Sequence, residues 1–324
     1  MHEGLRHSPA DPSPPGNQQS LTIAAETLAP SLPLTKASSL WQRAGSQMPT
    51  LRRLLAERSF AFGFTMVIVI TLFCFIGPLF YRTDQIHTNL AAINLPPGGS
   101  HPLGTDDLGF DVLGRLMAGG QSALEVALGV AVVATSVGFV WGATAGFLGG
   151  IADSIMMRVV DVLVAIPALF IIVYLATIIR PNVWTLIAVI GFISWLAPAR
   201  LIRGETLSIR THAFVDAART MGARSPGILR RHIIRNTVGV IVVNATFQVA
   251  DAILLLALLS FLGFGLPPPA VTWGGMLSSG ITFLYDGYWW QIYPAGAIIV
   301  ITVVGFNMMG DGLRSLTDAR LRQR

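Results

Sequence analysis

Side chains able to carry catalytic or metal chemistry are few in this 324-residue sequence, and they are scattered along it. All six histidines lie outside the long apolar stretches: His2, His7, His87, His101, His212 and His232. The only cysteine, Cys74, can form neither an internal disulfide nor a thiolate metal cluster. The only lysine, Lys36, follows Thr35 and precedes Ala37, so it does not belong to a phosphate-binding Gly-Lys-Ser/Thr loop. The sequence therefore predicts no catalytic residue, no metal site and no cofactor bound by the chain itself.

Two carboxylates inside apolar stretches are the exception. A charged carboxylate at the centre of a bilayer costs about 2.5–3.5 kcal/mol on insertion scales, so such groups face a cavity or a partner. We expect Asp251 to line a pathway or to latch helices across a subunit interface. Asp161 has the same interpretation and a second one, solvation near the inner surface or pairing with Arg158. Trp273, from an aromatic-rich loop, is a third candidate for the pathway or interface.

The elements that must position these side chains are apolar helices. Hydrophobic residues make up 52% of the chain and charged residues 12%, about half the charged share of a soluble domain. Apolar stretches long enough to span a bilayer occupy residues 60–81, 123–148, 159–179, 184–201, 238–262 and 292–309. Helices satisfy their own backbone hydrogen bonds in lipid. The predicted fold class is therefore an all-α polytopic membrane protein with about six transmembrane helices.

Arginine placement predicts the orientation of these spans. With the N-terminus inside, most basic residues fall in cytoplasmic segments, and Arg82, Arg115 and Arg180 alone fall outside. We expect both termini in the cytoplasm and a multi-pass protein of the cell inner (plasma) membrane, in contact with membrane lipid and not with nucleic acid. Residues 1–55, rich in Pro, Ser, Ala and Gln, are predicted to be a disordered cytoplasmic tail, and residues 56–324 the membrane domain.

Glycines, loops and prolines add further expectations about the spans. In the second span, Gly138, Gly142, Gly146 and Gly150 recur every four residues and form a smooth ridge, which packs within the bundle or against a partner subunit. The external loop 82–120 carries four aspartates. The external loop 263–290 is partly apolar, so it either dips back into the protein or is an ordinary ordered loop. Pro167 and Pro198 can kink the third and fourth spans.

The cytoplasmic loop at about 203–236 is arginine-rich but patterned. The apolar residues of its first short helix recur at helical spacing: Phe214, Ala217, Ala218 and Met221. Asp216 faces elsewhere, and Gly222 ends that helix. Ser225 and Pro226 begin a second one. The pattern alone leaves two interpretations open, an amphipathic helix on the lipid surface or a docking site for a cytoplasmic partner.

Asp216-Ala217-Ala218, with Gly222 four residues later, resembles the Glu-Ala-Ala loop of ABC importer permeases. Residues 232–236 (HIIRN) are similar to the stretch that follows this loop in the dipeptide/oligopeptide/nickel branch. Residues 101–109 (HPLGTDDLG), 259–265 (LSFLGFG) and 306–314 (FNMMGDGLR) resemble the C-type permease of that branch. The chain departs from the family pattern at Asp216, Arg235, Phe110 and Leu256, which stand where relatives have Glu, Pro, Arg and Glu.

The resemblance implies a non-catalytic, pore-forming subunit. Its expected partners are a homologous second permease, two cytoplasmic ATP-binding subunits that use ATP and Mg, and an extracytoplasmic substrate-binding protein. Phe214, Asp216, Ala217, Ala218, Met221 and Gly222 would then couple the pore to ATP hydrolysis. Di- or oligopeptides are the expected substrates. Nickel chelate, glutathione or haem carried by the same machine is one alternative, and a self-sufficient secondary transporter is another.

Overall fold

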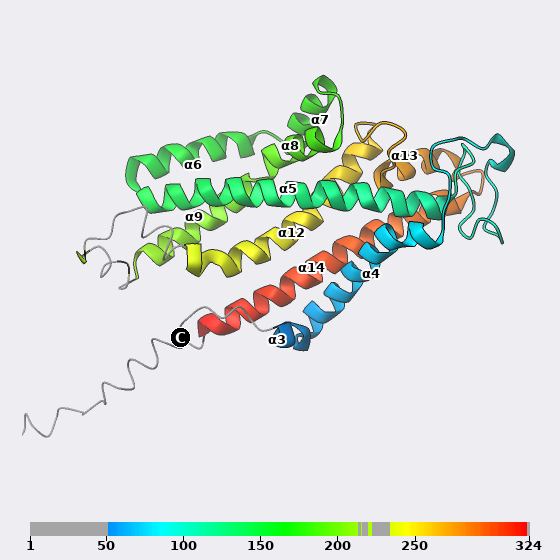
Figure 1. Ribbon diagram of the computed structural model, residues 1–324. Coiled ribbons are helices and arrows are strands. Elements are labelled where there is room, and N and C mark those ends of the chain that lie inside the picture. The colour runs from blue at the N-terminus through cyan, green and yellow to red at the C-terminus, as the bar shows by residue number, and fades with distance from the viewer. Residues whose placement is uncertain (1–50, 213–214, 216–219, 222–233, 323–324) are drawn as a thin grey trace, which may run out of the picture. The chain divides into compact units, whose positions relative to one another are not determined.

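The computed structural model describes residues 51–212, 215, 220–221 and 234–322, and within these ranges the chain is helical with no strand (Figure 1). The α-helices are α3 (Leu51–Ala56), α4 (Arg58–Phe80), α5 (Val112–Leu148), α6 (Gly150–Ala165), α7 (Ala168–Ile178), α8 (Val183–Ser194), α9 (Leu196–Arg210), α12 (Ile234–Phe261), α13 (Trp273–Phe283) and α14 (Tyr293–Arg322). Two short 3₁₀ helices are η1 (Leu90–Ala92) and η3 (Trp289–Gln291). Residues 1–50 of the predicted tail lie outside the described ranges, and its last residues belong to α3.

Six membrane spans fit the described helices. Four helices are long and apolar enough to cross a bilayer alone: α4, α5, α12 and α14. Two bent helix pairs pass the same test of length and composition together, α6 with α7 at 80° and α8 with α9 at 46°, and the count is six when each pair is taken as one span. The predicted fold class is confirmed. The third and fourth predicted spans are bent, each near the proline that the sequence marked as able to kink it.

Prolines account for both breaks. Pro167 is the residue before α7, at the sharper bend. Pro198 lies in the first turn of α9, and because it has no N–H it leaves the carbonyl of Ser194 without its usual helical partner. Gln248 of α12 donates its side-chain N–H to that carbonyl at 2.7 Å. The bend between α8 and α9 is therefore satisfied from a third helix.

The glycine ridge of α5 packs against α9 within this chain. A Cβ at Gly138 would meet Pro198, one at Gly142 would overlap the carbonyl oxygen of Ala199, and one at Gly146 would lie 2.9 Å from the carbonyl oxygen of Arg203. Of the two expectations for this ridge, packing inside the bundle holds for these three glycines. Gly150 is not part of the contact; it begins α6 with a φ of +55°.

A second close helix contact joins the two ends of the described chain. Helices α4 and α14 run side by side (Figure 1). At Gly63, an added Cβ would lie 2.6 Å from the carbonyl oxygen of Gly305. The main hydrophobic core lies among α5, α8, α12, α13 and α14, and includes Leu256. Leu256, one of the residues at which the sequence departs from the family pattern, is an apolar side chain fully buried in this core.

Residues 82–111 and 263–292, which include most of the segments predicted to be external (82–120 and 263–290), form a cap on one end of the bundle (Figure 1). Trp290 donates its indole N–H to the carbonyl of Thr105 at 3.0 Å, and Gln291 donates to the side chain of Asn94 at 2.6 Å. The later segment dips back into the protein as α13, one of the two expectations for it. The earlier segment is shorter than expected, because Asp111 caps α5 through Gly114 N–H and the helix begins at Val112.

Candidate functional site

In the sequence, the predicted coupling residues fall between the C-terminal end of α9 and the N-terminal end of α12, and those two helix ends lie opposite the cap (Figure 1). Most of them lie outside the described residues: Phe214, Asp216, Ala217, Ala218 and Gly222. Met221 is described, and its side chain is 80% exposed.

Both helices that flank this loop are tied into the bundle. Helix α9 lies on the glycine ridge of α5, where small residues bring the two backbones together. Helix α12 is bonded through Gln248 to the bend that precedes α9. A displacement of the loop would therefore act on α5, α8, α9 and α12 together.

Asp161 lies on α6 and forms an ion pair with Arg200 of α9, with 2.7 Å between Oδ1 and the guanidinium. Both side chains are about half exposed. The partner is thus an arginine from another helix, whereas the sequence suggested Arg158 from the same helix as one alternative.

Asp251 lies on the exposed side of α12. Its neighbours Ala250, Ala252 and Ile253 are buried, so the carboxylate points away from the core of this chain. Among the described residues it has neither a hydrogen-bond nor an ion-pair partner. In a membrane span, such a carboxylate requires water or another subunit beside it.

Trp273 lies inside the core. Only 2% of it is exposed, and its indole N–H donates to the carbonyl of Leu116 at 2.9 Å. Its neighbour Gly274 approaches Ala257 of α12 so closely that a Cβ would overlap that residue's carbonyl oxygen. These contacts give Trp273 a packing role between α13 and α5.

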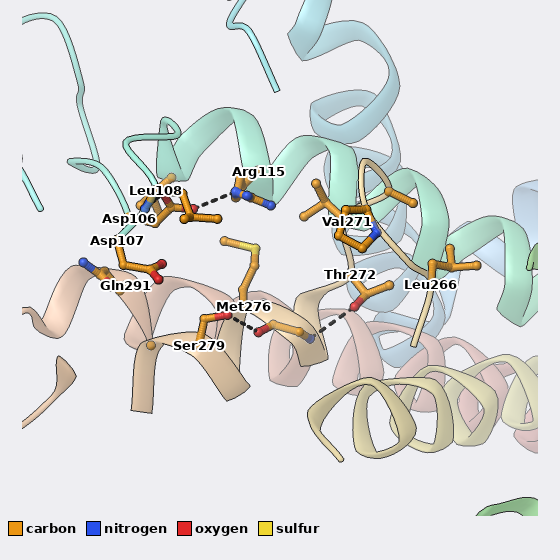
Figure 2. Close-up of a pocket in the computed structure, with 15 residues that line it drawn as sticks. Asp106, Asp107, Leu108, Arg115, Leu266, Val271, Thr272, Met276, Ser279 and Gln291 are labelled. Atoms are coloured by element: carbon orange, nitrogen blue, oxygen red, sulfur yellow. Dashed lines mark hydrogen bonds and ion pairs between the residues drawn. The ribbon is translucent and has the colours of Figure 1, made fainter. Parts of the chain in front are cut away.

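A pocket opens in the cap between α5 and α13 (Figure 2). It has about 810 Å³ of space not filled by protein atoms, part of it open to solvent. On one wall Arg115 lies 2.7 Å from a carboxylate oxygen of Asp106, and its guanidinium stacks over the ring of Phe110 at 4.1 Å. Met276 and Gln291 line the facing wall. Phe110, one of the residues at which the sequence departs from the family pattern, thus stacks on the Arg115 cation.

Beside this pocket, two further side chains contact the carboxylate of Asp111. One of its oxygens accepts a hydrogen bond from Tyr81 at 2.8 Å, and His101 lies 2.9 Å from the same oxygen. Burial, and then the hydrogen bond to Asp111, raise the pKa of the Tyr81 phenol to about 12. The hydroxyl therefore stays protonated, and remains a donor to Asp111, at physiological pH. Among the described residues, no three His, Cys, Asp or Glu side chains gather closely enough to hold a metal ion.

Four helices able to span a bilayer alone, together with two bent pairs that pass the same test, define a multi-pass membrane protein. Residues 138–323 match the family model described as binding-protein-dependent transport system inner membrane component. Residues 39–97 match the N-terminal transmembrane domain of oligopeptide transport permease C. The chain belongs to the family of binding-protein-dependent transport system inner membrane components, in its oligopeptide/dipeptide C-type branch, as the sequence blocks predicted.

Similar proteins cover nearly the whole chain. The oligopeptide transport system permease protein OppC of Bacillus subtilis is 36% identical, over 89% of this chain and 92% of its own length. The OppC of Escherichia coli is 37% identical, over 88% and 92%. The dipeptide transport system permease protein DppC of Bacillus subtilis is 34% identical, over 84% and 85%. The chain is accordingly a pore-forming, non-catalytic subunit of an ABC transporter in the inner membrane, and ATP is hydrolysed by separate subunits.

Proposed function

We propose that this permease subunit imports di- or oligopeptides. The observation that carries the proposal is that the relatives aligned over most of the chain are named as oligopeptide and dipeptide permeases. The alternatives, import of nickel chelate, glutathione or haem, have no such support. Selectivity in such systems lies largely in the binding protein, so the pore itself needs only to accept a peptide chain.

The working assembly pairs this chain with a homologous second permease. Two cytoplasmic ATP-binding subunits lie beneath the pair, and a substrate-binding protein docks above it. Both termini face the cytoplasm, as the arginine distribution supports. The cap then faces the binding protein, and its half-open pocket lies on that side.

Coupling runs through residues 213–235. Phe214, Ala217, Ala218 and Met221 supply the apolar face of the docking helix, Asp216 supplies its charge, and Gly222 permits the turn that follows. The exposed side chain of Met221 supports this role. ATP binding draws the two ATP-binding subunits together, and the loop transmits that movement to α9 and α12, a shift between two states of the assembly. Asp251 faces the pathway or the second permease.

The test is uptake of radiolabelled dialanine and pentaalanine by cells that depend on this transporter. The variants are Gly222→Asp and a deletion of residues 214–222, with the membrane level of the chain measured by immunoblot. We expect uptake of both peptides to stop while the chain stays inserted, and the ATP-binding subunits no longer to co-purify with it.

Two outcomes contradict the proposal at different points. Uptake that persists without the loop would overturn coupling through this segment and place the contact with the ATP-binding subunits elsewhere in the chain. Failure of the unaltered transporter to take up either peptide would overturn the substrate assignment and leave the subunit's place in an ABC transporter unaffected.

A further inference from the structure

Arg203 lies where three helices meet. It belongs to α9, two turns before that helix ends at Arg210. Its backbone carbonyl lies against Gly146 on the glycine ridge of α5, and its side chain reaches Asp153 in the first turn of α6. One residue thus contacts both helices of the α5–α6 hairpin from the helix that leads into the coupling loop.

The bond between Arg203 and Asp153 has the geometry of a strong ion pair. Nε and one terminal nitrogen of the guanidinium donate to the two carboxylate oxygens, each at 2.6 Å. This two-pronged arrangement fixes the relative orientation of the partners as well as their distance. The Asp153 side chain is 11% exposed and that of Arg203 is 35% exposed, so water competes less here than at an exposed surface pair.

Further contacts join the same helices. Arg200 and Asp161 pair at 2.7 Å, nearer the bend of each span. At the other end, Arg210 donates to the carbonyl of Gly146 at 3.5 Å. The Asp153–Arg203 bond lies between these two in the sequence of α9, and both of its side chains are less exposed than those of Asp161 and Arg200.

A purely local role for Asp153, confined to α6, predicts different behaviour. A carboxylate in the first turn of a helix stabilises that helix through its dipole. That role would need no arginine partner, and its loss would lower stability without changing how ATP hydrolysis is used. The two-pronged contact across 50 residues of sequence favours a role that links helices.

We propose that Asp153 and Arg203 are positioning residues that lock α6 to α9, so that movement of the coupling loop displaces α5, α6 and α9 as one body. This inference rests on the proposed coupling role of residues 213–235. Without the lock, α9 moves against α6, and part of the displacement produced by ATP is lost before it reaches the pore.

The experiment uses the complete transporter reconstituted in proteoliposomes with its binding protein and ATP. The variants are Asp153→Asn, Arg203→Gln, the double variant and Arg203→Lys. Two rates are measured in each, ATP hydrolysis and uptake of radiolabelled trialanine. We expect the number of peptides moved per ATP to fall roughly 2- to 30-fold in either single variant, the range seen for residues that carry coupling between sites.

Two further readouts separate positioning from stability. The double variant should be no worse than the single ones, because both remove the same bond. Arg203→Lys keeps the charge but loses the second prong, so its peptide-to-ATP ratio should fall between those of the unaltered transporter and Arg203→Gln. Arg158→Gln is the matched control. Arg158 lies on α6, as Asp153 does, but it is exposed and has no ion pair among the described residues, so its loss should leave the peptide-to-ATP ratio unchanged.

An unchanged peptide-to-ATP ratio in assembled Asp153→Asn and Arg203→Gln transporters would overturn the proposal, whether the two rates stay the same or fall together. If those variants do not assemble, the Arg203→Lys variant tests the proposal. A peptide-to-ATP ratio in this variant equal to that of the unaltered transporter would overturn the proposal. The proposed coupling role of residues 213–235 is tested by a different experiment, because persistent peptide uptake after removal of residues 214–222 would contradict that role alone.

Discussion

At the residue scale, Gln248 resolves a difficulty that Pro198 creates. The proline ring removes one helical hydrogen bond and leaves the Ser194 carbonyl unpaired within a membrane span. Gln248 is buried and donates to that carbonyl from α12. A bend inside a membrane span therefore requires a side chain from another helix to form the hydrogen bond that the backbone has lost.

We predict that Gln248→Leu destabilises the subunit. Leucine fills similar space but cannot donate, so the carbonyl of Ser194 is left buried without a partner, at a cost of roughly 1–3 kcal/mol. The measurement is the midpoint of thermal unfolding of the purified transporter in detergent. Adding Pro198→Ala restores a backbone N–H at that position and should recover part of the loss. A Gln248→Leu variant as stable as the unaltered protein would show that the hydrogen bond contributes little.

Asp251 carries the second prediction at this scale. Asp251→Leu should lower peptide uptake while the amount of chain in the membrane stays equal or rises, because leucine is favoured over aspartate at the centre of a span by about 3–4 kcal/mol. Labelled trialanine uptake, normalised to the immunoblot signal, tests this. Unchanged uptake would mean that the carboxylate serves neither a pathway nor a subunit contact.

Sequence reasoning found Asp161 and Asp251 because each is a charge inside an apolar stretch. It missed the Asp153–Arg203 bond for a physical reason. Asp153 lies between two predicted spans, where a carboxylate is common and gives no signal of its own. Arg203 belongs to a segment whose many arginines were already explained by the orientation of the protein in the membrane. Pairing across 50 residues is a property of the fold and has no local signal.

At the element scale, the contact of α5 with α9 depends on the absence of side chains. The four-residue spacing of the glycines predicted a smooth ridge, but a single sequence does not say which helix lies on it. The structure assigns α9, and with it the start of the coupling loop, to this ridge. The longest helix of the bundle is thereby placed directly against the segment expected to move.

We predict that Gly142→Ala weakens this contact. The new Cβ would overlap the carbonyl oxygen of Ala199, so the two helices must separate, and overpacking of this kind costs about 1–3 kcal/mol. Gly204→Ala is the matched control, because it is also a helical glycine but has nothing within 4 Å of an added Cβ. Thermal unfolding should show a lower midpoint for Gly142→Ala alone. Equal midpoints would argue against close packing of α5 and α9.

Hydropathy located all six spans but not their shapes. It measures length and composition, so it joined α6 to α7 and α8 to α9, and only the prolines hinted at the breaks. It also placed the start of the second span at residue 123, since residues 112–122 are less apolar. The cap by Asp111 instead begins α5 at Val112. The burial of α13 was one of two open interpretations, because a partly apolar loop either dips back into the protein or is an ordinary ordered loop.

At the scale of the whole molecule, the two ends of the bundle differ in chemistry. The cap brings together aspartates, aromatic side chains and a half-open pocket. The other end holds the C-terminal end of α9, with Arg210, and the C-terminal end of α14, with Arg314 (Figure 1). This asymmetry supports one orientation in the membrane, with the cap outside and the coupling loop inside.

Single-cysteine labelling tests that orientation. Cys74 is the only cysteine and is buried, so Cys74→Ala gives a background without thiols and removes few atoms from the core. In right-side-out membrane vesicles, a membrane-impermeant maleimide should label Tyr285→Cys, because that position in the cap is 96% exposed. Ser20→Cys in the tail should react only after the vesicles are permeabilised. Labelling of Ser20→Cys in intact vesicles would invert the topology, move the arginines of the coupling loop outside, and remove the ATP-binding subunits from reach of residues 213–235.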